Sequence, residues 1–377
     1  MINQPSKYRN RLIILIIGLV LGFQIPVQAQ QSQTDRLVIT PENISEINLL
    51  SQYQSHTSRI RGITFSSDGN RIVTMGRDDS DFDELVYFDV ESEQIVSTVD
   101  FSSQISPWAI FDTQFFNNSD NLMVTTDGAV FVWNTQSSQP SPTTTIVQSF
   151  ASASESIGAN RILVASGETG LLGIWSVATE IPSQPLDTEH SDLTNIAHLL
   201  MARQLDTPIS DIAYDEIHQQ IFVLGTNGNL YQFPSPPGYS LSDPEIVAQP
   251  ASEVRPETIA RANHLIALAP ETQWVAYAGS YRNVIIQDYV EDRLLSEYSL
   301  ESPVICLVSS PNHRILVIGE NAPEAELIFI DTLTFQEVNR INTEAPIQDC
   351  TYSPDGTLLA TANTNGEVSI WGISSGS

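Results

Sequence analysis

Residues 352–371 of this 377-residue chain read YSPDGTLLATANTNGEVSIW and decide the fold. An aromatic residue, Tyr352, precedes a Ser-Pro-Asp-Gly turn, and the apolar run Leu358–Ala362 follows that turn. A second turn at Asn365-Gly366 leads into Val368–Trp371. Because Asn-Gly is a preferred two-residue β-hairpin turn, the stretch predicts consecutive antiparallel strands.

The same unit recurs along the chain, and an early copy runs from Ile63 to Asp89 with a turn at Asp68-Gly69. Alignment of the third strands places seven residues at one equivalent position: Phe88, Trp133, Trp175, Phe233, Gln287, Ile330 and Trp371. Four copies have a glycine five residues earlier, where a hairpin turn needs a positive φ angle: Gly128, Gly170, Gly228 and Gly366. The spacings are 45, 42, 58, 54, 43 and 41 residues. Four of them match a blade of roughly 40 to 45 residues, so we predict an all-β, seven-bladed β-propeller.

Closure of the ring is predicted from the two ends of the repeats. The last repeat stops after Trp371 with no fourth strand, whereas the apolar segment Ile44–Tyr53 precedes the first repeat. We expect this N-terminal strand to complete the last blade, because the pairing removes an open sheet edge. The predicted organisation is a signal peptide over 1–29, a linker over 30–42 and a single propeller over 43–377.

The two long spacings mark insertions at about 183–208 and 234–256. Leu193, Ile196, Ala197 and Leu200 have helical spacing, and Ser191 or Asp192 could cap the start. We predict a short helix between blades 3 and 4, which either covers its own apolar stripe or binds a partner. The second insertion is rich in Pro and Ser and predicts a loop.

The N-terminus has the pattern of a secretory signal peptide. Three positive residues, Lys7, Arg9 and Arg11, precede an apolar run of 12 residues that ends at Phe23, and the small-residue site ends at Ala29. The run is shorter than the roughly 18 residues that span a bilayer, so we expect cleavage after Ala29 and no stable membrane anchor. The expected location is the periplasm or the exterior of a bacterial cell.

The charge argues against nucleic acid as a partner. The formal net charge is −29 at pH 7, and loss of the signal makes the chain still more acidic. Such a surface repels phosphate backbones. Lys7 is the only lysine, so the mature protein has none for Schiff-base chemistry or for a P-loop. The sequence does not tell whether the acidity serves a salty habitat, a cationic ligand or solubility.

The repeats resemble those of the WD-repeat family over about residues 43–373. Ser55-His56-Thr57 lies where that family has Gly-His, and the Asp-Gly turns and tryptophan positions agree. No copy has an intact Trp-Asp pair, and Phe88-Asp89 and Trp133-Asn134 come nearest, which puts the family's internal hydrogen-bond network in doubt. The resemblance implies a structural role for His56.

The resemblance also implies a binding face, because WD-repeat proteins commonly bind partners on the face that carries the turns between second and third strands. An exposed Trp, Tyr and Arg set within a polar rim is typical of interface hot spots. Trp108 is as compatible with a packed rim residue, and Trp274 aligns with Leu358 in a core strand. The candidate binding residues are His56, Arg77, Trp108, Asp127, Glu168, Asn227, Tyr281, Arg282 and Asn365.

Other motifs give weaker signals. Gly-x-Ser-x-Gly at 372–376 lacks the strand-turn-helix context of a hydrolase, and the six histidines show no zinc spacing. The acidic run Asp78–Glu84 could bind calcium or could simply be solvated. Cys306 and Cys350 lie on first strands of neighbouring repeats with an offset of one position, so a disulfide and two buried thiols both remain open.

We therefore expect a monomeric, non-enzymatic scaffold for a protein or peptide partner, with no catalytic residues, metal or cofactor. The alternative is an exported propeller hydrolase or lactonase-like enzyme with a metal at the central channel, because fold alone does not fix function.

Overall fold

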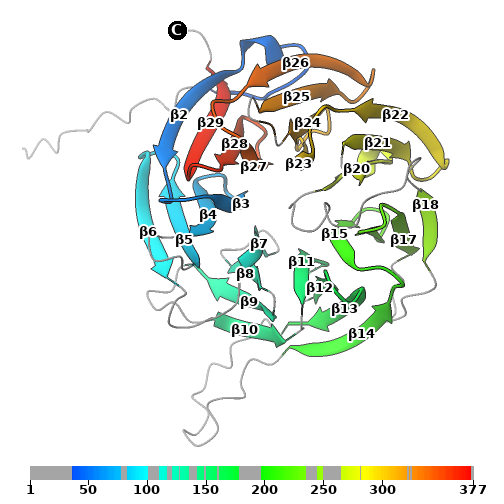
Figure 1. Ribbon diagram of the computed structural model, residues 1–377. Coiled ribbons are helices and arrows are strands. Elements are labelled where there is room, and N and C mark those ends of the chain that lie inside the picture. Colours follow the sequence, from blue (N-terminus) through cyan, green and yellow to red (C-terminus); the bar gives the residue numbers. More distant parts are fainter. Residues whose placement is uncertain are drawn as a thin grey trace, which may run out of the picture. The chain divides into compact units, whose positions relative to one another are not determined.

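The computed structural model describes residues 36–77, 83–100, 110–116, 121–126, 128–135, 142–147, 150–158, 161–177, 197–234, 244–248, 265–280, 282–320, 322 and 325–374. The strands in these residues form seven antiparallel sheets, which Figure 1 shows as blades around a common axis. The first strand of each blade contacts the first strand of the next, and the last blade contacts the first. The predicted all-β propeller with seven blades is confirmed.

Six blades have four strands each, and these strands follow one another along the chain from the axis outward (Figure 1). Blades 1 to 3 consist of β3 (Ile60–Phe65), β4 (Arg71–Arg77), β5 (Asp83–Asp89) and β6 (Gln94–Asp100); β7 (Ile110–Phe115), β8 (Asn121–Thr126), β9 (Ala129–Asn134) and β10 (Pro142–Val147); β11 (Ala151–Ser156), β12 (Arg161–Ser166), β13 (Leu171–Ser176) and β14 (His198–Gln204). Blades 4 to 6 consist of β15 (Ile209–Asp215), β16 (Gln220–Gly225), β17 (Leu230–Pro234) and β18 (Glu245–Ala248); β19 (Ile266–Ala269), β20 (Trp274–Ser280), β21 (Asn283–Asp288) and β22 (Arg293–Ser299); β23 (Val304–Ser309), β24 (Ile315–Glu320), β25 (Glu326–Asp331) and β26 (Gln336–Asn342).

Blade 7 combines the two ends of the described chain. Its strands β27 (Ile347–Tyr352), β28 (Leu358–Asn363) and β29 (Glu367–Ser374) come from the last repeat, and β2 (Asn48–Gln54) pairs antiparallel with β29. The short strand β1 (Arg36–Leu37) also pairs with β29. The predicted closure by an N-terminal strand is therefore confirmed, although Ile44–Glu46 forms the 3₁₀ turn η1 rather than part of the strand.

The hydrophobic core lies between blades. Each of the main apolar clusters joins side chains of adjacent blades, such as Trp371 of blade 7 with Phe329 of blade 6. The predicted third-strand alignment holds, because each of the seven aligned residues pairs with the second residue of its blade's second strand. Trp274, expected in the core, is buried. A single blade is too thin to bury its own faces, so stability comes from stacking around the ring.

The prediction of a helix between blades 3 and 4 is wrong for the part of the insertion that the structure describes. Residues 198–204 form β14, the outer strand of blade 3, and the described residues contain no α-helix, only η1 and the 3₁₀ turn η3 (Pro270–Thr272). Ser191, Asp192, Leu193 and Ile196 lie outside the described residues. An outer strand packs on one side only, and the exposed Leu199 and Leu200 therefore do not show the alternation of a buried strand.

The second insertion also differs from the prediction. Its described part includes β18, which pairs with β17 as the outer strand of blade 4. The sequence around β18 is rich in Pro and Ser, so the composition predicted a loop and the four strand residues were not recognised. Ile246, one of the four, is exposed. The outer strand is thus the element that this sequence specifies least.

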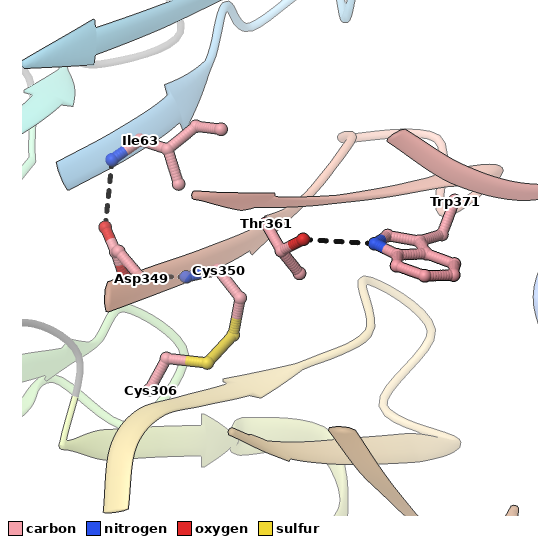
Figure 2. Close-up of a disulfide and its surroundings, with 6 residues drawn as sticks. All are labelled: Ile63, Cys306, Asp349, Cys350, Thr361 and Trp371. Carbon is pink, nitrogen blue, oxygen red and sulfur yellow. Dashed lines mark hydrogen bonds between the residues drawn. A yellow bond between two sulfur atoms is a disulfide. The ribbon is translucent and has the colours of Figure 1, made fainter. Parts of the chain in front are cut away.

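Side chains from the first strands tie neighbouring blades together (Figure 2). Six of the seven first strands have a β-bulge after their first residue, as in β15 and β27. In blade 7 the buried carboxylate that follows the bulge, Asp349, accepts the Ile63 N–H of blade 1 at 2.9 Å. In blade 4, Asp211 accepts the N–H groups of Leu265 and Ile266 at 2.6 and 2.9 Å. These carboxylates therefore bond to the next blade.

The two cysteines form a disulfide between blades 6 and 7, with their Cα atoms 5.8 Å apart. Cys306 occupies the position of Asp349 and reaches toward the next blade, whereas Cys350 is one residue further and reaches back. The two cysteines are offset by one position, so their side chains point to opposite faces of their own blades. Because the two blades are neighbours, these opposite faces meet, and the cysteines come together. Figure 2 shows this bond beside the Asp349 contact to blade 1, so blade 7 is tied on both sides.

Candidate functional site

The candidate site is the face that carries the turns between second and third strands, here called the turn face. In an antiparallel blade the second strand ends, the third begins and the fourth ends at one edge, so the connections to the next blade lie there too. Backbone bonds join the two kinds of loop: Leu205 N–H donates to Gly170 O, and His56 N–H to Gly366 O, at 2.9 and 3.0 Å. At blades 3 and 7 the turn and the connection to the next blade are therefore joined by hydrogen bonds.

His56 supports the turn face from below. Its side chain is fully buried, with Nδ1 3.0 Å from Glu84 Oε1 and Nε2 2.9 Å from Thr74 Oγ1. Thr74 Oγ1 also lies 2.5 Å from the Ser55 hydroxyl. Burial lowers the pKa of His56 to about 4, so the imidazole is neutral at pH 7. Part of the network that was in doubt is thus present in blade 1, without a tryptophan because Phe88 stands at that position, and His56 has a structural role.

A second network shapes the turn face at blade 4. Asn227 Oδ1 accepts the Asn229 N–H at 3.0 Å, and its Nδ2 donates to the Tyr231 hydroxyl at 3.1 Å. That hydroxyl donates to Asp206 at 3.3 Å. The half-buried Asn227 therefore fixes its turn, while Asp206 is exposed beside it.

Blade 7 has a comparable arrangement. Asn365 is exposed, and its N–H donates to Asn363 Oδ1 at 2.8 Å while its carbonyl oxygen accepts from Gln54 at 2.7 Å. Gly366 has a φ of 83°, and a Cβ there would lie 2.1 Å from the His56 carbonyl oxygen. Only glycine fits this close approach between the turn and the connection to blade 1.

The predicted binding residues divide into three groups. Glu168, Arg282 and Asn365 are exposed on the turn face, while Asn227 and His56 are partly or fully buried beneath it. Arg77 ends β4, and nothing is described of its side chain. The other candidates lie outside the described residues: Trp108, Asp127 and Tyr281. The prediction from the sequence thus named residues of one face, but it did not separate exposed residues from the buried residues beneath them.

Two residues of the acidic run Asp78–Glu84 have a structural role that the sequence did not indicate. Asp83 Oδ2 accepts the Ile110 N–H of blade 2 at 2.8 Å and lies 3.4 Å from Arg61 Nη1. Glu84 bonds to His56. Residues 78–82 lie outside the described residues, so the calcium hypothesis stays a prediction. Among the described residues, no group of three or more His, Cys, Asp or Glu side chains could hold a metal ion.

Two glutamates lie close together on the turn face at blade 6. Burial and the nearby Glu326 raise the pKa of Glu320, which lies 5% exposed at the end of β24. Arg340 pairs with both Glu326 and Glu337.

A cavity of about 90 Å³ lies against the first strands β7, β11, β15 and β19. It is lined by Asp112, Gln114, Ser152, Ala153, Ser154, Glu155, Ser210, Asp211, Ile212, Ala213 and Ile266. Most of these are the second to fifth residues of the six- or seven-residue first strands, so the cavity lies along the middle of the axial wall. No sequence motif marks it, because its residues come from four separate repeats.

Comparison with known proteins gives two matches. The family model described as "WD domain, G-beta repeat" matches residues 47–81 and 336–372. The second match spans β26 of blade 6 and the first three strands of blade 7, so the sequence repeat is offset from the blade by one strand.

The chain is also 27% identical over 110 residues to the "Meiotic recombination protein rec14" of Schizosaccharomyces pombe. This similarity covers 29% of this chain and 36% of that protein. It therefore reaches about a third of the relative's length. Among the described residues, none forms a helix with the length and apolar character needed to cross a membrane.

Proposed function

The chain is a WD-repeat β-propeller, and from this premise we propose that it is a non-enzymatic scaffold that binds a protein or peptide partner on its turn face. Proteins with this fold commonly serve as scaffolds for protein–protein interaction. The observation that carries the proposal is the construction of the turn face. Glu168 of blade 3 and Arg282 of blade 5 are exposed there, and in blade 4 between them the side chain of Asn227 fixes the turn by hydrogen bonds.

Rigidity of this kind favours binding, because a preorganised surface loses little conformational entropy when the partner docks. Asn365 illustrates the arrangement, since its backbone is bonded on both sides while its side chain is exposed. The chain's formal net charge of −29 favours a partner with a basic surface and speeds their encounter.

We also propose that the protein acts outside the cytoplasm, in the periplasm or secreted. The positive and apolar pattern of residues 1–29 supports export, and the Cys306–Cys350 disulfide is of a kind that persists in oxidising compartments. Fractionation of the producing cells, followed by N-terminal sequencing, tests both the location and the cleavage after Ala29.

The scaffold proposal is tested by charge reversal on opposite faces. Glu168→Arg changes the turn face, and Glu291→Arg makes the same change in the turn between β21 and β22 on the opposite face. Each protein is immobilised and used to capture crosslinked partners from an extract of the exported fraction. We expect Glu168→Arg to lower capture of a specific band about tenfold or more and Glu291→Arg to leave it unchanged.

Equal capture by both variants, at equal thermal stability, would show that the turn face is not the binding surface. If only Glu291→Arg lost capture, the partner would bind the opposite face of the propeller. Arg282→Glu provides an independent reversal on the turn face, two blades away from Glu168.

A further inference from the structure

An exposed aromatic residue, Phe150, lies on the turn face. It belongs to the connection between β10 of blade 2 and β11 of blade 3, directly before Ala151, the first residue of β11. Its side chain is 44% exposed and belongs to none of the apolar clusters that the described residues form. Packing in the described core therefore does not explain an aromatic side chain at this position.

The backbone of Phe150 is strained. Its φ of 60° lies in the left-handed region, which is unfavourable for a bulky side chain and readily adopted by glycine. Six other described residues besides glycines have a positive φ, and all lie in turns on the opposite face: Glu93, Gln219, Gln273, Asp292, His313 and Phe335. Phe335 also packs against a core cluster, which Phe150 does not. Within the described chain, Phe150 is thus the one such residue on the turn face.

Hydrogen bonds hold Phe150 against the turn between β12 and β13. Its carbonyl oxygen accepts the Gly167 N–H at 2.9 Å, and the next residue, Ala151, pairs with Ser166 in the sheet. Phe150 therefore lies opposite Gly167, one residue away from the exposed Glu168. An aromatic and an anionic side chain, both exposed, thus start from neighbouring points of the turn face.

The turn that carries Glu168 is itself fixed. Thr169 donates its N–H and its hydroxyl to Ser166 Oγ at 3.1 and 2.7 Å, and Gln204 donates to the Thr169 carbonyl oxygen. The Glu168 carboxylate forms no hydrogen bond or ion pair with the rest of the described chain. Its oxygens are therefore available to a partner on a turn that is already ordered.

An aromatic ring beside a free carboxylate suits a guanidinium group. A guanidinium stacks its flat face on an aromatic ring, and its N–H groups donate to a carboxylate in the plane, whereas an ammonium is a compact and strongly hydrated charge. An apolar side chain on the ring would remove water from the carboxylate without supplying a donor. The formal net charge of −29 also attracts a cation.

We propose that Phe150 and Glu168 together bind the guanidinium group of an arginine that the partner presents. The inference rests on the proposed scaffold function and adds the chemistry of the partner. The ring of Phe150 supplies the stacking surface, and Glu168 supplies the acceptor oxygens. Binding also explains why a phenylalanine, rather than a glycine, occupies a strained position at the surface.

The first test uses the peptide acetyl-Gly-Arg-Gly-amide as the probe. The purified protein is titrated with it at constant ionic strength, and binding is followed by saturation-transfer NMR. Three matched peptides replace the arginine by citrulline, which is planar but uncharged, by lysine or by leucine. We expect one saturable site for the arginine peptide and binding about threefold or more weaker for each of the others.

Two substitutions test the two groups separately. Phe150→Gly should weaken the arginine peptide about threefold or more, because the stacking surface is lost. Glu168→Gln should weaken it about twofold or more, because the acceptor loses its charge. Since glycine adopts a φ of 60° freely, Phe150→Gly should keep the melting temperature within about 3 °C of the parent. Phe150→Asn is a second variant, because asparagine also tolerates this region.

Phe335→Gly is the matched control. It removes a phenylalanine with a φ of 52° from a turn on the opposite face. Because Phe335 packs against a core cluster, this variant should lower the melting temperature, yet its affinity for the arginine peptide should equal that of the parent. The two glycine variants thus separate binding from packing.

Any of four results would overturn the inference. These are no saturable binding of the arginine peptide, equal or tighter binding of another peptide, parental affinity in Phe150→Gly, or a melting temperature lowered by more than about 5 °C in both Phe150 variants, which would make the ring structural.

The capture assay separates this inference from the scaffold function. If Phe150→Gly captures the partner as the parent does while Glu168→Arg does not, the scaffold function stands and the arginine inference fails. If neither substitution affects capture, both fail.

Discussion

Replacement of Trp371 by alanine should destabilise the whole ring. Trp371 is 9% exposed, packs in the cluster between blades 6 and 7, and donates its indole N–H to Thr361 Oγ1 at 3.0 Å (Figure 2). Truncation of a buried tryptophan to alanine costs about 3 to 5 kcal/mol from lost burial and the cavity left behind. The hydroxyl of Thr361, a residue that is 5% exposed, also loses its partner, so we expect a loss near the upper end of that range.

Equilibrium unfolding in urea, followed by far-UV circular dichroism, measures this loss. Trp371→Phe retains most of the buried area and removes only the N–H, so it should cost about 1 to 2 kcal/mol. Leu333→Ala, at a position that is 63% exposed, serves as the control and should change the free energy of unfolding by about 0.5 kcal/mol or less. A loss below about 1 kcal/mol for Trp371→Ala, with an unchanged urea slope, would refute the assigned burial and its part in ring closure.

Four further outcomes follow from the inter-blade contacts and the turn face. Asp349→Ala should lower the free energy of unfolding by about 2 to 4 kcal/mol in the same urea assay, because buried N–H groups lose their acceptor; a change below 1 kcal/mol would show that the carboxylate does not tie the blades. Changing Cys306 and Cys350 together to serine should cost about 2 to 4 kcal/mol by the same measurement, since the disulfide closes a sequence separation of 44 residues, and equal stability with and without it would argue against the bond. The pKa of His56 is lowered to about 4 in the folded state and is about 6.5 when unfolded, so its contribution is present above pH 6.5 and is lost as the pH falls to about 4; His56→Gln should therefore flatten the stability-pH curve in this window by up to about 3 kcal/mol, and parallel curves would contradict the assigned burial. Gly366→Ala should cost more than about 1 kcal/mol in thermal unfolding, because its Cβ meets the His56 carbonyl oxygen and its φ of 83° is strained for alanine, whereas an unchanged melting temperature would contradict the close approach.

The repeat positions were predictable because they lie in the inner three strands. Phe88, Trp133 and Trp371 face neighbouring blades, so packing restricts them to large side chains, and their alignment in the sequence agrees with their register. The outer strands β14 and β18 were missed because only one of their faces packs, and Leu200 and Ile246 are exposed there. A pattern of burial cannot reveal an element that is mostly exposed.

The cysteine pairing and the cavity could not be predicted from the sequence, for a different reason. Both depend on contacts between blades, and the spacing within one repeat carries no information about which face meets the next blade. Cys306 and Cys350 differ by one position, which within one sheet separates side chains but between two sheets joins them. Ser210 and Asp112 likewise come together only when the ring is assembled.

The pairing of β2 with β29 has a consequence for biogenesis. Residues 48–54 leave the ribosome more than three hundred residues before their partners at 367–372 are made. Throughout synthesis and any passage across a membrane, the earliest strand must remain without its final neighbour, and six blades can assemble before the seventh. A chaperone that shields this early segment would serve the protein best during that interval, and closure of the ring joins strands that are made far apart in time.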